Sequence, residues 1–463
     1  MDMDVIAIPL PFQGHINPML RFCNCLSARG VKVTLLLTHS VAKSMQSSLS
    51  DHAAAAFEFI SDGTDVGDPP RSFGEYVACM RAAVSNEVAG VLEKKKKSGG
   101  GGGAVVYDSF MPWLVEVGRA AGFRVAAFFT QTASVCSIHC YHRRMAAMLR
   151  GGRRRAEQEE EEERVLRFPC LPEMDPGDLP SYSYFGEIAE EVAVFAGNQA
   201  SNMHRADCLL FNTFDALEPE VVKLMATRWK VMTIGPLVPN PSKRLMHGKQ
   251  DRIDLFKLDN EVYTKWLDNR ESKSVVYVSF GSLVVLSKEQ MGEIAMGLVD
   301  SNKYFMWIVR ESEETKLPKD FKSKTSEKGV IVRWCPQVEV LSHHAVACFM
   351  THCGWNSTLE ALTLGVPMVG IPQHDDQQTN AKFIEDVWKV GVRIKVSETK
   401  IITRHQIRSS IKEATEGVRA EELWRNAAKW KRLAEEATSE GGSSDVNISN
   451  FISHMALVEP ISN

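Results

Sequence analysis

The sequence predicts an α/β protein made of two doubly wound domains, each a parallel sheet with helices on both faces. Short apolar runs alternate with helix-like segments in both halves of the chain, which is the order typical of parallel sheets. The 463 residues are more than one hydrophobic core usually serves. A stretch with three prolines and no periodicity, residues 236–250, is the best candidate for a linker between the halves.

The first half opens with a strand–helix–strand unit over residues 5–37. We expect Asn17 to cap its helix and Pro18 to stand in the first turn, because apolar residues recur at helical spacing directly after them. The next strand is predicted at 31–37. Two further apolar runs predict later strands of the same sheet, 104–108 and 125–129.

Two low-complexity segments, 93–103 and 153–164, interrupt this half. Neither has an apolar period, so each is expected to be a solvated or disordered loop. In the second half, a strand with a glycine turn is predicted at 274–282 and a helix near 287–300. Further strands are expected near 304–309, 329–333, 345–352 and 366–371.

The bulk composition excludes several kinds of partner. A net charge of −4 is too near balance for a nucleic-acid or membrane-surface partner. Ten cysteines without a C-x-x-C pair do not make a disulfide framework and fit a reducing compartment. No signal peptide is recognisable, and no apolar run approaches the roughly 20 residues of a membrane helix. We therefore expect a cytoplasmic monomer without a membrane span.

Residues 334–377 carry most of the chemical information. A buried apolar strand ends at His352, and a helix follows with Asn356 or Ser357 expected at its cap and Glu360 one turn in. A helix N-terminus presents N–H groups and partial positive charge, so it suits a diphosphate. His352, Asn356 and Ser357 can add donors to the same anion, and Glu360 can accept hydrogen bonds from a ribose.

Other residues of this half also follow predicted strands. Trp334 offers a flat face for a base, Asp376 and Gln377 suit sugar hydroxyls, and Ser282 follows a glycine turn. Because the carboxyl ends of parallel strands meet at one edge of a sheet, these residues should converge there. Each alone is more typical of a core aromatic, a helix cap or a solvated side chain. Together they favour a ligand site.

The segment resembles the signature box of plant secondary-product glycosyltransferases, the UDP-sugar-dependent family. "HCGWNSTLEAL" and the closing "DQ" stand as the family has them. Further segments extend the resemblance over the whole chain: "PFQGHINP", "YDSFMPW", "FFTQT", "FNTFDALE", "IGPL", "VSFGS" and "GGSSDVNI". They are most similar to the subgroup that glucosylates plant hormones, phenolic acids and terpenoid or steroid aglycones.

The resemblance implies two facing Rossmann-like domains, the GT-B arrangement, with a cleft between them. The N-terminal domain, 1–237, would bind the acceptor, and the C-terminal domain, 258–440, would bind the UDP-sugar. A linker would span 238–257. The last residues, 441–463, would form a helix that packs back on the N-terminal domain.

The resemblance also implies a role for each residue of the donor site. Uracil would stack on Trp334, near the main chain of Cys335 and Gln337, and the ribose would bind Glu360. The diphosphate would be held by His352, Asn356, Ser357 and Ser282. The sugar would meet Trp355, Asp376 and Gln377, with Thr130 reaching it from the other domain. Members that end the box in Gln tend to take UDP-glucose, and neither a metal nor another cofactor is implied.

The stretch "LPFQGHINP", residues 10–18, has one glycine where a phosphate cradle would have several. The family uses this histidine, His15, as the catalytic base and pairs it with Asp108, which ends the strand at 104–108. The chemistry agrees, because a neutral imidazole can take the proton of an attacking hydroxyl and a carboxylate can orient it. The resemblance thus implies an inverting UDP-glucose-dependent glucosyltransferase acting on a hydroxyl or carboxyl of a small lipophilic plant metabolite.

Apolar residues of the first half are candidates for the lining of an acceptor pocket, although ordinary cores contain the same residue types. They are Phe12, Phe110, Met111, Trp113, Phe129, Tyr182, Tyr184 and Phe185.

Other classes of protein fit less well. A nicotinamide-dependent dehydrogenase requires G-x-G-x-x-G with an acid about 20 residues on, and "PFQGHINP" lacks these glycines. A sugar-nucleotide-binding protein without catalysis would more often lack His15 or Asp108. A metal-dependent transferase would place Asp-x-Asp at a strand end, whereas "DMD" precedes the first strand. His343, His344 and His374 show no metal-ligand spacing.

Overall fold

The computed structural model describes residues 3–45, 55–64, 72–97, 103–141, 167–239, 253, 260–395 and 401–456. The chain divides into two compact units. Unit 1 contains residues 1–239, 246–255 and 436–463, and unit 2 contains residues 240–245 and 256–435. The predicted loop at 153–164 and most of the predicted linker lie outside the described residues.

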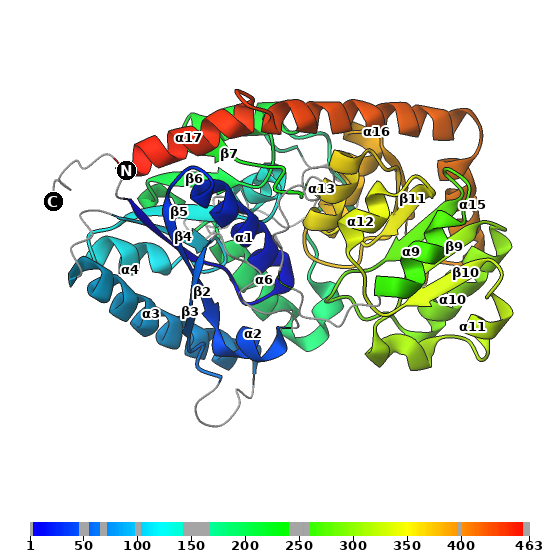
Figure 1. Cartoon of the computed structure of the whole chain (residues 1–463), viewed down its shortest axis with the longest axis horizontal. Helices are drawn as coiled ribbons and strands as arrows, with labels where there is room; N and C mark the ends of the chain where they lie inside the picture. Colours follow the sequence, from blue (N-terminus) through cyan, green and yellow to red (C-terminus); the bar gives the residue numbers. More distant parts are fainter. Residues whose placement is uncertain are drawn as a thin grey trace, which may run out of the picture. The chain divides into compact units, whose positions relative to one another are not determined.

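Unit 1 is built on a parallel sheet of order β3-β2-β1-β4-β5-β6-β7 (Figure 1). This order reverses between β1 and β4, which are hydrogen-bonded neighbours although about a hundred residues separate them. The strands are β1 Asp4–Ile8, β2 Lys32–Thr38, β3 Ala56–Ile60, β4 Gly103–Asp108, β5 Arg124–Phe129, β6 Cys208–Phe211 and β7 Val231–Thr233.

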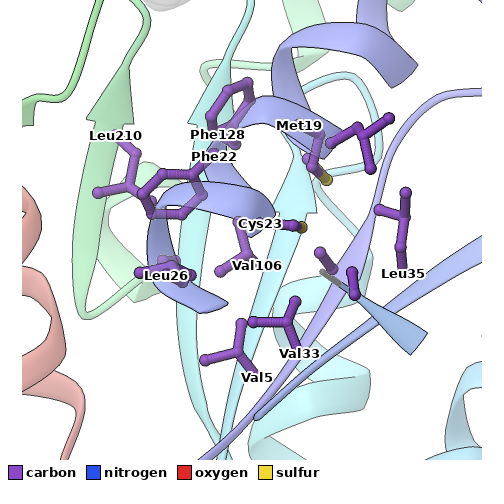
Figure 2. Packing of buried hydrophobic residues seen from close by; sticks show 14 of the residues in the cluster. Val5, Met19, Phe22, Cys23, Leu26, Val33, Leu35, Val106, Phe128 and Leu210 are labelled. Atoms are coloured by element: carbon purple, nitrogen blue, oxygen red, sulfur yellow. The ribbon is translucent and has the colours of Figure 1, made fainter. Parts of the chain in front are cut away.

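Helices cover both faces of this sheet because alternate residues of each buried strand point to opposite faces. Val5 and Val106 pack with α1 and α17 in one core cluster, whereas Ile6 and Val105 belong to a second cluster with α3, α4 and α7. Figure 2 shows Met19, Phe22, Cys23 and Leu26 of α1 resting on the strands of the first cluster. The helices of unit 1 are α1 Gln13–Ser27, α2 His39–Ser44, α3 Phe73–Lys97, α4 Leu114–Ala120, α6 Ala189–Asn198, α7 Pro219–Ala226 and α17 Ser443–Ala456. Short 3-10 helices cover Pro176–Asp178, Ser183–Ile188 and Met203–Arg205.

Two local predictions in unit 1 are wrong. Helix α1 begins at Gln13 with Phe12 as its N-cap, so Pro18 lies inside the helix and Asn17 does not cap it. The Asn17 side chain instead accepts a hydrogen bond from the backbone N–H of Ile253. The predicted loop at 93–103 is helical up to Lys97. Lysine is a good helix former, and positive charge is favourable in a last turn.

Unit 2 has a similar topology with one strand fewer, a parallel sheet of order β10-β9-β8-β11-β12-β13. The order reverses between β8 and β11, which pair directly. The strands are β8 Val275–Ser279, β9 Tyr304–Ile308, β10 Gly329–Val332, β11 Val346–Thr351, β12 Met368–Gly370 and β13 Gly391–Arg393.

The helices of unit 2 cover both faces of its sheet. Val276 and Val278 of β8 pack with α10 and α15, while Tyr277 between them faces the other side, stacked on Phe349 of β11. The helices are α9 Asn260–Asp268, α10 Lys288–Asp300, α11 Phe321–Lys324, α12 Gln337–Ser342, α13 Trp355–Leu364, α14 Gln377–Lys382, α15 Arg404–Thr415 and α16 Gly417–Thr438. A 3-10 helix covers Glu311–Lys316, and a π-helical turn, Phe383–Val387, continues α14.

The last described helix, α17, belongs to unit 1. Its Ile448, Phe451, Ile452 and Met455 lie in the same core cluster as α1, and Phe451 packs on Phe22 with ring centroids 5.4 Å apart. No helix among the described residues is both long enough and apolar enough to span a bilayer.

Candidate active site

The structure brings His15 and Asp108 together at the point where the strand order of unit 1 reverses. Asp108 is the last residue of β4, and His15 lies in the first turn of α1, directly after β1. His15 Nδ1 lies 2.8 Å from Asp108 Oδ2. The His15 side chain is 19% exposed, whereas the Asp108 side chain is fully buried. A buried carboxylate therefore holds an imidazole that remains open to a ligand.

Hydrogen bonds fix the Asp108 carboxylate in this position. Oδ1 accepts from the backbone N–H of Phe110 at 3.1 Å, and Oδ2 accepts from the N–H of Leu10 at 3.4 Å. An ionised carboxylate only accepts, so His15 Nδ1 carries the proton and the lone pair resides on Nε2. Thr130 Oγ1, placed by the sequence analysis at the sugar, lies 3.1 Å from His15 Nδ1 within unit 1.

Aromatic rings surround the imidazole. Phe110 meets it edge-on with centroids 5.2 Å apart, and Phe12 lies 6.5 Å away and is 37% exposed. Phe195 of α6, which the sequence analysis missed, packs 5.6 Å from Phe110, and Phe73 follows at 5.7 Å from Phe195. The sequence holds no signal for this row, because Phe73 and Phe195 come from two helices far apart in the chain. The row makes the surroundings of His15 apolar.

Three of the predicted acceptor-lining residues, Phe110, Met111 and Phe129, are buried in one core cluster of unit 1. Phe129 is 0% exposed and stacks on Phe211 with centroids 4.5 Å apart, and Met111 is 1% exposed in the same cluster. Trp113 and Tyr182 are partly buried against this cluster. Tyr184 and Phe185 are half-buried and pack edge to face in the 3-10 helix Ser183–Ile188.

Buried amides join the loops that follow β4 and β5. Gln199, the residue after α6, accepts from Ser109 Oγ at 3.2 Å and donates to Gln131 Oε1 at 2.9 Å. All three side chains are buried. Ser109 and Gln131 are the chain neighbours of Asp108 and Thr130, so this bridge ties together the two loops that hold the imidazole.

In unit 2, the predicted donor residues follow the carboxyl ends of strands that form one parallel sheet. Ser282 follows β8, Trp334 follows β10, His352 follows β11, and Asp376 follows β12. The strand order reverses between β8 and β11, and ligands of open α/β sheets bind at such a point. The guanidinium of Arg310, not anticipated from the sequence, donates to the carbonyl oxygens of Ser282 and Val284. It thereby fixes the loop after β8.

His352 lies between two glycines at this reversal point. A Cβ on Gly281 would meet the imidazole at 2.8 Å, and one on Gly354 would meet it at 2.4 Å. Burial, together with the neighbouring His374, lowers the pKa of His352 to about 3. Burial also lowers the pKa of His374 to about 4. Both rings are therefore neutral near pH 7, and His352 offers a ligand an N–H donor rather than a charge.

These two histidines make stability depend on pH. An unfolded histidine takes up a proton near its ordinary pKa of about 6.5, whereas folded His374 does so only near pH 4. Between these values the unfolded state binds more protons, so stability falls as pH falls. By pH 5 the loss from His374 alone reaches about 2 kcal/mol.

We expect His374→Gln to remove this share of the pH dependence. Asp376 acts in the opposite direction, because burial and the Asp375 carboxylate raise its pKa, so the variant must be compared with the wild type. Urea unfolding of both proteins at pH 7 and pH 5 measures the difference. An equal loss of stability in both proteins would show that His374 titrates normally.

The N-cap of α13 is not the one that the sequence predicted. Gly354 is the N-cap, and it has no side chain with which to make a capping hydrogen bond, so neither Asn356 nor Ser357 caps the helix. Ser357 Oγ instead accepts from Gln337 Nε2 at 2.9 Å. The same amide nitrogen donates to Glu360 Oε2 at 2.9 Å. The two residues predicted for diphosphate and ribose thus share one donor.

The predicted sugar-binding residues are mostly engaged within the protein. Trp355 is buried with its ring 6.1 Å from that of Trp388. Gln377 Oε1 accepts from the backbone N–H groups of Gln373 and His374, at 2.9 and 3.2 Å, and so closes the loop before α14.

Asp376 lies at the start of the same helix. Its Oδ2 accepts from Asn380 Nδ2 at 2.9 Å, and this amide also donates to the carbonyl of Cys353. The loop after β12 is therefore held to the loop after β11, at the sheet edge where the candidate donor residues lie.

The described residues contain no group of three or more His, Cys, Asp or Glu side chains placed to hold a metal ion. None of the ten cysteines, all within the described residues, forms a disulfide.

Comparison with known proteins identifies the family. Residues 243–425 match the family described as UDP-glucoronosyl and UDP-glucosyl transferase. UDP glycosyltransferase 9 of Catharanthus roseus is 44% identical over 97% of this chain and 96% of its own length. UDP-glucosyltransferase 74AE2 of Panax ginseng is 41% identical over 97% and 98%.

A solved structure extends the likeness to the fold. Os79 from O. sativa in complex with UDP is 34% identical, with a TM-score of 0.86 over 98% of this chain and 100% of its own. The same protein has been solved with U2F and trichothecene, at a TM-score of 0.82. Relatives above 40% identity along almost their whole lengths, together with this shared fold, show that the chain belongs to the plant UDP-glycosyltransferase family, enzymes of GT-B fold that transfer a sugar from a UDP-sugar to small plant metabolites.

Proposed function

We propose that the enzyme is an inverting glucosyltransferase that uses His15 as its general base, with UDP-glucose as donor and a small lipophilic alcohol, phenol or carboxylic acid as acceptor. The observation that supports this most strongly is the 2.8 Å contact between the partly exposed imidazole and the buried Asp108 carboxylate. Asp108 holds the Nδ1 proton, so Nε2 is free to accept another one. A non-catalytic binding protein would need no such pair.

In the proposed reaction the acceptor hydroxyl attacks the anomeric carbon of glucose while Nε2 of His15 removes the hydroxyl proton. A new carbon–oxygen bond forms as the bond from this carbon to the diphosphate breaks, and the electron pair leaves with UDP. Attack from the side opposite UDP converts an α-linked donor into a β-glucoside. Asp108 stabilises the imidazolium that forms, and the aromatic row around His15 would favour an apolar acceptor.

We propose that the donor binds at the carboxyl edge of the unit 2 sheet. Trp334 would stack on uracil beside Cys335, and Glu360 would accept from the ribose. The N-terminus of α13 and the donors of its first turn, Asn356 and Ser357, would bind the diphosphate. Neutral His352 would add an N–H donor, and Ser282 would add a further contact. These groups suit the charge that develops on departing UDP.

Glucose as the transferred sugar is supported by the names of relatives such as the ginseng UDP-glucosyltransferase. Gln377 and Asp376 are the proposed sugar contacts, with Trp355 contributing through its backbone because its ring is buried. Thr130, whose Oγ1 lies 3.1 Å from His15 Nδ1, would be the sugar contact from unit 1. We also propose that the enzyme works as a monomer in the cytoplasm without a metal.

We expect Gln377→Ala to raise the KM for UDP-glucose and to leave the Kd of UDP within about 2-fold. UDP lacks the sugar, so only the donor should sense the lost amide. Enzyme kinetics and calorimetry with UDP measure the two quantities, and Gln378→Ala, the next residue of α14, is the matched control. A fall in UDP affinity as large as the change in KM would assign Gln377 to the loop that it closes.

The proposed function is tested by incubating the enzyme with UDP-glucose and a panel of lipophilic alcohols, phenols and carboxylic acids. Mass spectrometry should find acceptors that have gained one hexose. Binding of UDP without any transfer, over a broad panel, would instead indicate a sugar-nucleotide-binding protein.

A further inference from the structure

We propose that the sulfur atoms of Cys136, Cys140 and Met203 form a binding site in unit 1 for a soft monovalent metal ion such as Cu(I). None of the three ligands belongs to the His15–Asp108 pair or to the proposed donor residues. The inference does not rest on the proposed function, and the metal would take no part in sugar transfer.

The three sulfur atoms come together from two segments of unit 1. Cys136 and Cys140 stand about one turn apart in a helix whose described part covers residues 133–141, so they share one of its faces. Met203 opens the 3-10 helix Met203–Arg205. Its Sδ lies 3.9 Å from Cys136 Sγ and 3.6 Å from Cys140 Sγ. The two thiols also share a hydrogen bond with each other, so the three sulfur atoms form a closed triangle.

The size of this triangle suits a metal ion with three sulfur ligands. A metal–thiolate bond is about 2.3 Å long, which places the sulfur atoms about 4 Å apart when the metal lies at the centre of their triangle. The two edges at Met203, 3.6 and 3.9 Å, are already close to this spacing. Coordination would therefore require only small movements of the side chains. The ion would replace the S–H hydrogens and their weak contacts, so the site does not depend on any sulfur lacking a partner.

The set of ligands determines which metal the site favours. Thiolate and thioether sulfur are soft ligands and select Cu(I). Zinc prefers four ligands from Cys, His and carboxylates, and the part of the chain that the structure describes has no group of three or more His, Cys, Asp or Glu side chains placed to hold a metal. The third ligand of this cluster is a methionine, which is not a usual zinc ligand. The cluster therefore favours Cu(I) over Zn(II).

The cluster is buried but can be reached through one of its members. Cys136 and Met203 are 0% and 2% exposed, whereas Cys140 is half-buried, so an ion would enter past Cys140. Burial and the contact with Cys140 raise the pKa of the Cys136 thiol, and the Glu218 carboxylate raises it further. Cys136 therefore carries its proton near pH 7. The neighbouring negative charge that holds this proton would also favour a cation in its place.

The binding step exchanges protons for the metal. One Cu⁺ forms two copper–thiolate bonds and one copper–thioether bond, while two S–H bonds break and their protons pass to the solvent. No oxidant or reductant is needed, and the occupied site carries one net negative charge. Because protons compete with the metal, the affinity for Cu(I) should rise by up to about 100-fold per pH unit, about 10-fold for each proton released.

The test titrates the reduced full-length enzyme with Cu(I) under nitrogen, in competition with the chelator bicinchoninate. Cys140→Ser and Met203→Leu each remove one ligand. Cys25→Ser is the matched control, because Cys25 is another half-buried helical cysteine of unit 1. Loss of an outer-shell partner alone costs roughly 10–100-fold in metal affinity. We therefore expect the wild type to hold one tightly bound Cu(I), and both ligand variants to bind it at least about 10-fold more weakly.

Two further measurements identify the ligands. X-ray absorption at the copper edge should show three sulfur neighbours in the wild type and two in Met203→Leu. The pH dependence of the affinity should fall to about 10-fold per unit in Cys140→Ser, which releases one proton fewer. Leucine has nearly the shape and volume of methionine, so Met203→Leu should keep the Tm and the transferase activity of the wild type.

The same titration can contradict the inference. No tightly bound Cu(I) in the wild type, or an unchanged affinity in either ligand variant, would overturn it. An equal loss of affinity in Cys25→Ser would also overturn it, because copper would then be bound adventitiously at several cysteines.

Discussion

The variant His15→Ala is expected to transfer glucose to an alcohol roughly 10²–10⁴-fold more slowly than the wild type, which is the usual worth of a positioned general base. An alcohol is a weak nucleophile near pH 7, and without Nε2 its proton must leave to water. The loss should appear in kcat, because the base acts in the transition state rather than in binding.

The same variant should retain its fold and its affinity for UDP. His15 belongs to unit 1, whereas the proposed donor residues belong to unit 2. His204→Ala, at an exposed histidine of the 3-10 helix Met203–Arg205, is the control and should retain full activity. A comparable loss in both variants, or a loss of UDP affinity in His15→Ala, would count against proton transfer as the role of His15.

The second large effect is expected for Asp108→Asn. The amide keeps the shape of the carboxylate, and its oxygen can still accept from the Phe110 N–H. In the wild type, the carboxylate oxygen Oδ2 accepts the proton of His15 Nδ1. In the variant, the NH₂ group of the asparagine would face Nδ1 instead. The imidazole would then favour the tautomer with its proton on Nε2, which is unable to act as a base.

We therefore expect Asp108→Asn to lower kcat by roughly 10²–10⁴-fold as well. In the double variant His15→Ala/Asp108→Asn the loss should hardly exceed that of His15→Ala, because the two residues act as one unit. Kinetics on the two single variants and the double variant measure this coupling. Losses that multiply would mean that Asp108 has a separate role, such as holding the loop after β4.

The sheets of both units could be predicted from the sequence because buried parallel strands are continuous apolar runs. The run at 104–108 falls within β4, that at 125–129 within β5, and that at 345–352 contains β11. The meeting of His15 with Asp108 agrees with the same reasoning, since His15 comes just after β1, Asp108 ends β4, and these two strands are neighbours in the sheet.

The starts of the helices could not be predicted in the same way. Capping signals in the sequence rest on side-chain hydrogen bonds, but the N-caps of α1 and α13 are Phe12 and Gly354, and neither makes one. Asn17 and Ser357 have the chemistry of caps and make tertiary hydrogen bonds instead. Local preference was overridden by packing.

The networks of hydrogen bonds between side chains could not be predicted from the sequence either. A bridge of hydrogen bonds from Tyr277 through Gln337 to Glu360 joins residues of β8, α12 and α13, and nothing local marks them as partners. Phe129 illustrates a second limit, because its side chain lies on the same face of β5 as Val125 and Ala127 and packs with them in the core. An aromatic residue at a strand end can face either a ligand or the core, and the residue type alone does not decide between the two.

The central claim, that His15 is a general base, is tested most directly by comparing two acceptors in His15→Ala. One is a secondary alcohol, and the other is a phenol acidic enough to be ionised at the assay pH. Both are measured with saturating UDP-glucose in the wild type and in the variant. An ionised phenol needs no base, so its kcat should fall by less than about 10-fold while that of the alcohol falls by roughly 10²–10⁴-fold. Equal losses for the two acceptors would show that His15 only shapes the pocket and would contradict the proposed mechanism.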